Sequence, residues 1–112
     1  MKIENTKAQM RKGVLEFCIL SILKKEEAYP SDIIAQLKRS KMIVVEGTIY
    51  PLLTRLKNGG ILDYRWEESK SGPPRKYYKL SSMGATFLLE LEETWSELTT
   101  AVKLNTKNTA NK

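Results

Sequence analysis

EGTIYPLLTRLKNGG, residues 46–60, is the most informative segment of this 112-residue chain. Its apolar residues recur at i, i+3, i+4 and i+7, the spacing that places them on one buried stripe of a helix. The polar residues between them would then face outward. The buried stripe would consist of Ile49, Leu52, Leu53 and Leu56, and the outer face of Tyr50, Thr54, Arg55 and Lys57.

Local sequence also predicts where this helix begins and ends. We expect it to begin near Gly47 or Thr48, with Thr48 as a suitable N-cap. Pro51 would then lie in the first turn, where its missing N–H has no helical acceptor to lose. Asn58-Gly59-Gly60 predicts a left-handed stop.

Two more helices are expected before this segment. Apolar residues from about Met10 to Lys25 cover more than one stripe, which is typical of a helix with neighbours on several sides. Pro30-Ser31-Asp32 predicts the start of a second helix that ends near Ser40.

A hairpin and a long helix are expected after it. Strands at 61–67 and 75–80 would flank segment 68–74, which is rich in turn-forming residues. Tyr77 and Tyr78 alternate faces, so one of them is expected in the core, where Tyr64 and Trp66 are also candidates. Ser81-Ser82 would cap the last helix, whose apolar residues form a heptad seam for lengthwise helix packing. The seam is Leu88, Leu91, Trp95, Leu98 and Val102.

This order of elements predicts a mainly helical α+β fold, a winged helix-turn-helix with a long C-terminal dimerisation helix. In such folds the third helix lies in the major groove of DNA, and the hairpin, or wing, meets the backbone. Candidates for base or groove contact are Tyr50, Thr54 and Arg55, although each could also be an ordinary surface residue. Candidates for phosphate contact are Thr48, Lys57, Lys70, Arg75 and Lys76.

Basic charge is concentrated in the same part of the chain. Residues 1–80 carry 16 Lys or Arg and 9 Asp or Glu, whereas residues 81–112 carry 3 and 4. A polyanion would bind the basic part. This distribution favours double-stranded DNA as the partner.

Catalysis has little support in the sequence. The chain has no histidine, and its one cysteine, Cys18, is interpreted as a small core residue, with a redox role as the alternative. We expect no metal, no cofactor and no enzyme activity. The N-terminus lacks the apolar core of a signal peptide, and no apolar run approaches the length of a membrane span, so a cytoplasmic protein is expected.

Several segments carry a family resemblance: GTIYPLL (47–53), Arg55-Leu56, GIL (60–62) and GPPRKYYKLS (72–81), with Gly84 and Trp95. Together they are similar to the PadR family of bacterial transcriptional regulators, over about residues 10–102. One departure is Tyr29-Pro30, where the family usually has Tyr-Gly.

The resemblance implies a homodimeric repressor that binds an operator of dyad symmetry. Residues 1–80 would form the DNA-binding domain, 81–106 the dimerisation helix and 107–112 a disordered tail. In some members, paired tryptophans at the dimer centre hold a planar aromatic ligand, and Trp95 is the matching position. Phe87, Leu88 and Leu91 would line the same surface. The alternative for Trp95 is plain interface packing.

Two other kinds of function remain open. The chain could be a small-molecule-binding protein whose basic wing is incidental, or an adaptor that docks other proteins through its hairpin.

Overall fold

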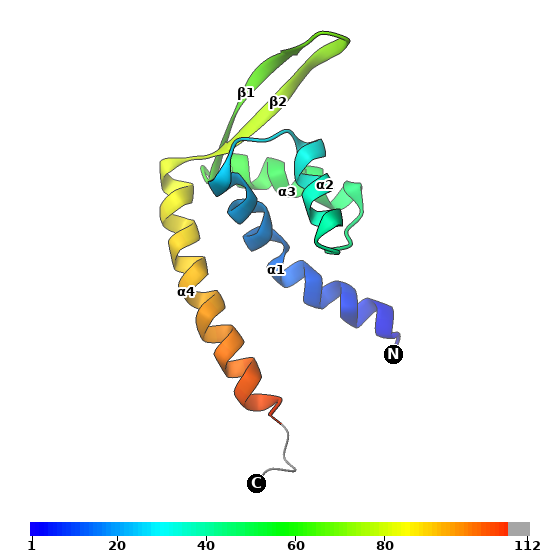
Figure 1. Cartoon of the computed structure of the whole chain (residues 1–112), viewed down its shortest axis with the longest axis vertical. Coiled ribbons are helices and arrows are strands. Elements are labelled where there is room, and N and C mark those ends of the chain that lie inside the picture. Colours follow the sequence, from blue (N-terminus) through cyan, green and yellow to red (C-terminus); the bar gives the residue numbers. More distant parts are fainter. Residues whose placement is uncertain (108–112) are drawn as a thin grey trace.

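The computed structural model describes residues 1–107 as four helices and a two-stranded hairpin (Figure 1). The elements are α1 (Ile3–Lys25), α2 (Pro30–Arg39), α3 (Glu46–Asn58), β1 (Leu62–Ser69), β2 (Gly72–Leu80) and α4 (Ser82–Asn105). Their order confirms the predicted winged helix-turn-helix with a long last helix. The expected tail comprises residues 107–112, and residues 108–112 of it lie outside the described part of the chain.

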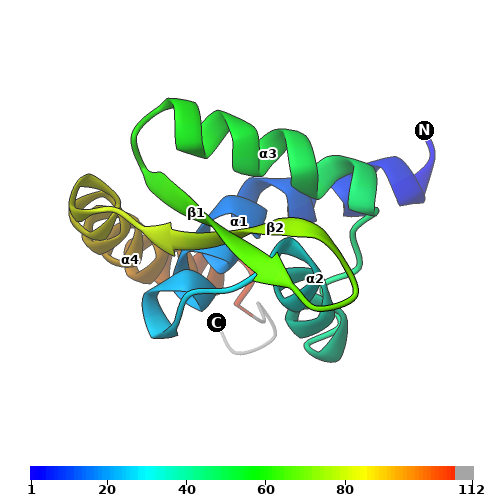
Figure 2. The same cartoon turned by 90° about the horizontal axis from the view of Figure 1, so that it is seen from above.

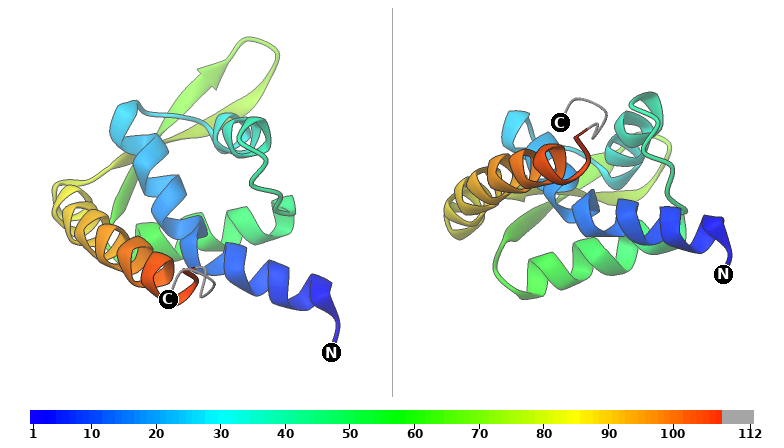
Figure 3. Two further views of the ribbon diagram at one scale, coloured as in Figure 1. Left: turned by 60° about the horizontal axis from the view of Figure 1, so that its bottom comes forward. Right: turned by 90° about the horizontal axis from the view of Figure 1, so that it is seen from below.

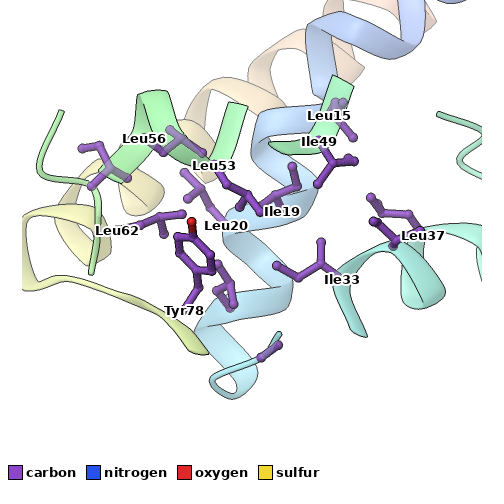
Figure 4. Packing of buried hydrophobic residues seen from close by; sticks show 14 of the residues in the cluster. Leu15, Ile19, Leu20, Ile33, Leu37, Ile49, Leu53, Leu56, Leu62 and Tyr78 are labelled. Carbon is purple, nitrogen blue, oxygen red and sulfur yellow. The ribbon is translucent and has the colours of Figure 1, made fainter. Parts of the chain in front are cut away.

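α1 is the centre of the fold, as its several apolar stripes predict. It lies between α2 and α4 (Figure 3), and its side chains meet those of the other elements in one core (Figure 4). The buried residues of α1 are Leu15, Ile19, Leu20 and Leu23. The same core contains Ile33, Leu37, Ile49, Leu53, Leu56, Leu62 and Tyr78 from α2, α3 and the hairpin.

α1 begins at Ile3, well before the predicted start near Met10. The prediction relied on apolar periodicity, whereas residues 1–10 are all exposed. No proline or glycine interrupts the chain before Gly13, so the helix continues outward from the core. This first part of α1 projects away from the other elements (Figure 1).

The start of α3 differs from the prediction. Val45 is the N-cap and Thr48 lies inside the helix, so the prediction that Thr48 caps it is wrong. Pro51 is therefore a helix-interior residue, and the carbonyl of Gly47 lacks its usual donor. Both residues are exposed, so water can satisfy that carbonyl.

The C-terminal stop of α3 is confirmed. Gly60 has a φ of 82°, in the left-handed region that favours glycine. The N–H groups of Gly60 and Ile61 donate to the carbonyl oxygens of Lys57 and Leu56, each at 3.0 Å. This is a Schellman motif, and it turns the chain directly from α3 into β1.

The hairpin is longer than predicted and its turn is shorter. β1 and β2 pair antiparallel from Leu62 opposite Leu80 to Ser69 opposite Gly72, with a bulge between Glu67 and Ser69. Segment 68–74 is therefore mostly strand rather than loop. Its prolines, Pro73 and Pro74, are tolerated because both strands of a two-stranded sheet are edge strands. The hairpin extends from the helices at the end opposite the tip of α4 (Figure 1).

α4 begins at the predicted cap. The Ser81 hydroxyl accepts a hydrogen bond from the Gly84 N–H at 2.9 Å, and the Ser81 N–H donates to the Ile61 carbonyl at 3.1 Å. Gly84 is buried against the chain at Ile61. These contacts attach the start of the long helix to the base of the wing.

Candidate nucleic-acid interface

The outer face of α3 carries the side chains that the periodicity predicts. Ile49, Leu53 and Leu56 are buried, whereas Thr54 and Arg55 are exposed. Tyr50 is also exposed, at 49%. The Thr54 hydroxyl donates to the backbone carbonyl of Tyr50 at 3.1 Å, as occurs on solvent-facing helix turns. The predicted outward orientation of these three residues is therefore confirmed, while contact with DNA stays a prediction.

Arg55 already has an anionic partner in the subunit. Its Nη2 lies 3.2 Å from the Glu16 carboxylate of α1, and the Arg55 side chain is 67% exposed while that of Glu16 is 29% exposed. An exposed ion pair of this kind contributes little to stability, about 0–1 kcal/mol. Arg55 therefore lies on the side of α3 that faces α1 and can exchange Glu16 for another anion at small cost.

One face of the wing carries most of its aromatic side chains. Trp66 lies opposite Lys76, and Tyr64 lies opposite Tyr78, so these residues share one face. Tyr78 is buried and is the core member of the Tyr77-Tyr78 pair. Trp66, in contrast, is 61% exposed, so it is not the core residue that the sequence allowed.

Cationic side chains of the wing lie over aromatic rings. The Lys76 ammonium is 4.7 Å from the centre of the Tyr64 ring, and the Arg75 guanidinium is 3.9 Å from that of Tyr29. Lys57 of α3 also lies over Tyr64, at 5.6 Å. These contacts hold the cations in place while leaving their N–H groups free to bind anions.

A groove of about 420 Å³ separates the wing from α3 and the start of α2. We call it the wing groove. Figure 2 looks onto this side, where the hairpin crosses the helices. Of the predicted DNA-binding residues, four line it together: Tyr50, Thr54, Arg75 and Lys76.

The other predicted residues lie elsewhere. Thr48 and Arg55 line a second groove, of about 320 Å³, between α3 and α1. Lys57 lies near the end of α3, and Lys70 is exposed at the hairpin turn. The DNA-facing candidates therefore follow one surface from α1 across α3 to the wing.

Electrostatics in the wing groove favour an anion. Among the described residues that line it, Arg75 and Lys76 are basic and none is acidic. Burial raises the pKa of Tyr78, so this phenol stays neutral and adds no negative charge. The charge of the groove therefore favours an anionic ligand over a cationic one.

Sequence reasoning did not assign the other six lining residues to the site: Tyr29, Pro30, Ser31, Trp66, Pro74 and Tyr78. Tyr29 and Ser31 belong to the start of α2, which only the folded chain brings beside the wing. Ala28 pairs with Tyr78 through two backbone hydrogen bonds of 3.0 and 2.8 Å, and this bridge holds the start of α2 at the edge of β2. No spacing along the chain could reveal that contact.

The effector candidates on α4 are divided by burial. Trp95 is 41% exposed, and its ring centre lies 5.8 Å from that of Phe17 on α1. Phe87 is 36% exposed and Leu91 is half-buried. Leu88 is only 1% exposed, so its assignment to a ligand-facing surface is wrong: it packs into the core of its own subunit.

Other kinds of site have little support in residues 1–107. This part of the chain contains no helix long and apolar enough to cross a bilayer, and no group of three His, Cys, Asp or Glu placed to hold a metal. Cys18 is half-buried beside the core, and burial raises the pKa of its thiol. A higher thiol pKa leaves less of the reactive thiolate at neutral pH.

The chain is similar to known regulators over most of its length. Residues 19–90 match the model of the transcriptional regulator PadR-like family. A PadR-like transcription factor from Bacteroides fragilis is 62% identical, over 88% of this chain and 96% of its own, with a TM-score of 0.75. A PadR family regulator from Eggerthella lenta is 33% identical, over 95% and 94%, with a TM-score of 0.84.

A further similar structure contains nucleic acid. Bacillus subtilis PadR in complex with operator DNA is 27% identical, over 70% of this chain and 46% of its own, with a TM-score of 0.64. The fold, the motifs and the family match agree. The chain therefore belongs to the PadR-like family of transcriptional regulators, which are DNA-binding proteins rather than enzymes.

Proposed function

We propose that this protein is a cytoplasmic repressor that binds an operator of dyad symmetry as a homodimer. The observation that carries the proposal is the surface of exposed polar, basic and aromatic side chains that runs from the outer face of α3 to the wing groove. Tyr50, Thr54 and Arg55 would contact bases or the major groove. Phosphates would be bound by Thr48, Lys57, Lys70, Arg75 and Lys76.

Dimerisation is supported by apolar side chains that the subunit leaves in solvent. Along the seam of α4, Trp95, Leu98 and Val102 are 41%, 48% and 51% exposed. On the projecting part of α1, Ile3 and Met10 are 64% and 73% exposed. Apolar surface of this extent is typical of an interface, and a second copy of the chain would cover both helices.

A twofold dimer would place two α3 helices on one face of DNA. If their centres lie about 34 Å apart, which is one turn of the duplex, each can read one half-site. In this arrangement α4 determines the spacing of the helices, because it joins the wing of one subunit to the partner. Any change in the packing of α4 would change operator affinity.

An aromatic effector is a second proposal, supported by the surroundings of Trp95. A cavity of about 80 Å³ lies beside Trp95 and Phe17, bordered by Leu91 and Leu98. Ligand sites usually measure about 300 Å³ or more, so one subunit cannot hold a planar aromatic molecule. The site would need the matching surface of the partner subunit, with Phe87 at its edge.

α1 gives such a ligand a route to the DNA-binding face. Neighbouring residues of α1 contact the two functional helices: Phe17 contacts Trp95 of α4, and Glu16 pairs with Arg55 of α3. A ligand that separates α4 from α1 would therefore shift Phe17. Because Phe17 is next to Glu16 in α1, this shift would be passed on to the Glu16–Arg55 pair. A coupling free energy of about 1–3 kcal/mol would be enough to change operator occupancy.

The test of DNA reading compares three alanine variants by fluorescence anisotropy with labelled duplexes. Arg55→Ala should weaken operator binding more than binding to random duplex, because a base contact costs about 1–3 kcal/mol when lost. Lys76→Ala should weaken both DNAs similarly and lower the slope of log affinity against log salt by about one.

Lys79→Ala is the matched control, since Lys79 is an exposed lysine of the same strand on the opposite face. It should change binding less than Lys76→Ala. Affinity that is insensitive to salt and to DNA sequence in the wild-type protein would instead favour the small-molecule or adaptor readings.

The effector proposal predicts that planar aromatic dyes quench the fluorescence of Trp95. Trp66 also emits, so the measurement uses Trp66→Phe as the starting protein. Quenching should saturate, and binding of the same dyes, followed by the emission of the dye itself, should disappear in Trp95→Ala while sedimentation shows an intact dimer. Unchanged emission up to the solubility limit of the dyes would mean that Trp95 only packs the interface.

A further inference from the structure

Trp66 has the most exposed aromatic side chain of the described residues. It lies on the outer part of β1, 61% exposed, and it is not a member of the core cluster. Exposed tryptophan often marks a contact surface, because its ring offers a large area with little conformational entropy to lose. Its neighbours in the wing groove indicate what it would contact.

We propose that Trp66 packs against a deoxyribose of the DNA strand whose phosphates are bound by Arg75 and Lys76. The wing groove would then hold one strand of the operator backbone. This inference rests on the proposed function and adds to it a contact that involves neither a base nor a charge.

The first argument is the fixed geometry around the ring. Trp66 and Lys76 are directly opposed across the hairpin, and the Lys76 ammonium lies 5.6 Å from the centre of the Trp66 ring. Tyr64 meets Trp66 edge to face, with ring centres 5.9 Å apart. The Lys76 ammonium therefore lies over the Trp66 ring, so an apolar ring and a cation are close neighbours, as sugar and phosphate are in a DNA backbone.

The second argument is the continuity of the groove with the α3 surface. Trp66 lines the wing groove together with Tyr50 and Thr54, which face it from α3. A strand that enters between the wing and α3 would pass Trp66 before it reaches the outer face of α3. Because bases in a duplex are stacked, the apolar part open to a wing residue is the sugar rather than the base.

The third argument is charge. Two of the described residues lining the groove, Arg75 and Lys76, are basic, and none is acidic. A neutral planar compound could use the rings but would leave the positive charge of both cations without a negative counterpart. A phosphodiester strand satisfies both features, so the groove is better matched to DNA than to a small aromatic molecule.

The test compares wild-type protein with Trp66→Ala and Trp66→Phe on an operator sequence, obtained by selecting bound fragments from random duplex DNA, and on random duplex. We expect Trp66→Ala to bind both about tenfold more weakly, the effect of losing one well-packed aromatic contact. The ratio between the two DNAs and the salt slope should not change, since a sugar contact neither reads bases nor releases counterions. Trp66→Phe should keep most of the affinity.

Hydroxyl-radical footprinting locates the contact, because these radicals attack exposed deoxyribose. Trp66→Ala should lose protection at the sugars under the wing and keep it at the sugars beside α3. The thermal transitions of the variants should match that of the wild type, because Trp66 lies outside the core.

Several outcomes would overturn the inference. They are an unchanged affinity and footprint in Trp66→Ala, a loss confined to one DNA sequence, and quenching of Trp66 by an aromatic dye but not by DNA. A wild-type protein that binds no duplex would instead contradict the proposed function, so the two failures can be told apart.

Discussion

Leu98→Glu is expected to separate the homodimer and to lower operator affinity at least about 100-fold. Leu98 is 48% exposed in the subunit and lies on the heptad seam of α4. In a twofold interface the substitution places a carboxylate from each subunit among apolar side chains. An uncompensated buried charge costs about 3–5 kcal/mol, and 1.4 kcal/mol corresponds to a factor of ten.

Leu89→Glu is the matched control for this substitution. Leu89 is also on α4 and is 62% exposed, but it lies nine residues earlier, which places it on the opposite side of the helix at 3.6 residues per turn. Sedimentation should show monomers for Leu98→Glu and dimers for Leu89→Glu. Equal dimer stability in the two variants would mean that the seam is not the interface.

Gly84→Ala is expected to destabilise the fold by about 3 kcal/mol or more, a large value for a single added methyl group. A Cβ at this position would lie 2.1 Å from the carbonyl oxygen of Ile61 and 2.9 Å from the Leu80 side chain. The oxygen belongs to the backbone and also accepts the Ser81 N–H, so it cannot move aside without loss of that bond. The start of α4 would have to move away from the wing.

The same substitution at Gly47 provides the comparison. Nothing lies within 4 Å of a Cβ added there, and Gly47 is inside α3 with a helical φ. Gly47→Ala should therefore stabilise the protein by about 0.5–1 kcal/mol. Thermal unfolding should show the two variants shifted in opposite directions, and a stable Gly84→Ala would contradict the packing of α4 on the wing.

Features governed by local periodicity were predictable from the sequence. The buried stripe and the outer face of α3 follow from the 3.6-residue period, and the stop at Gly60 follows from the freedom of glycine at positive φ. The start of α3 was not predictable in this way. A threonine that could cap the helix lies two residues inside it, because the chain before it is already helical from Glu46.

Features that depend on contacts between distant segments were not predictable. Trp66 could be placed on a strand, but the turn and the register across the hairpin decide whether its face is covered. The Glu16–Arg55 pair joins residues 39 apart in the chain, and it depends on how α1 crosses α3. Leu88 fits the heptad seam, yet the packing of α4 onto its own subunit buries it.

The most direct test of whether the outer face of α3 recognises DNA sequence is a selection of bound fragments from random duplex DNA. It is carried out with the wild-type protein and with Arg55→Ala. The wild-type protein should enrich inverted repeats whose half-site centres lie about one helical turn apart. Arg55→Ala should keep the repeat and its spacing but lose the preference at one position in each half-site. Fragments with no common sequence, or identical preferences for the two proteins, would contradict the account.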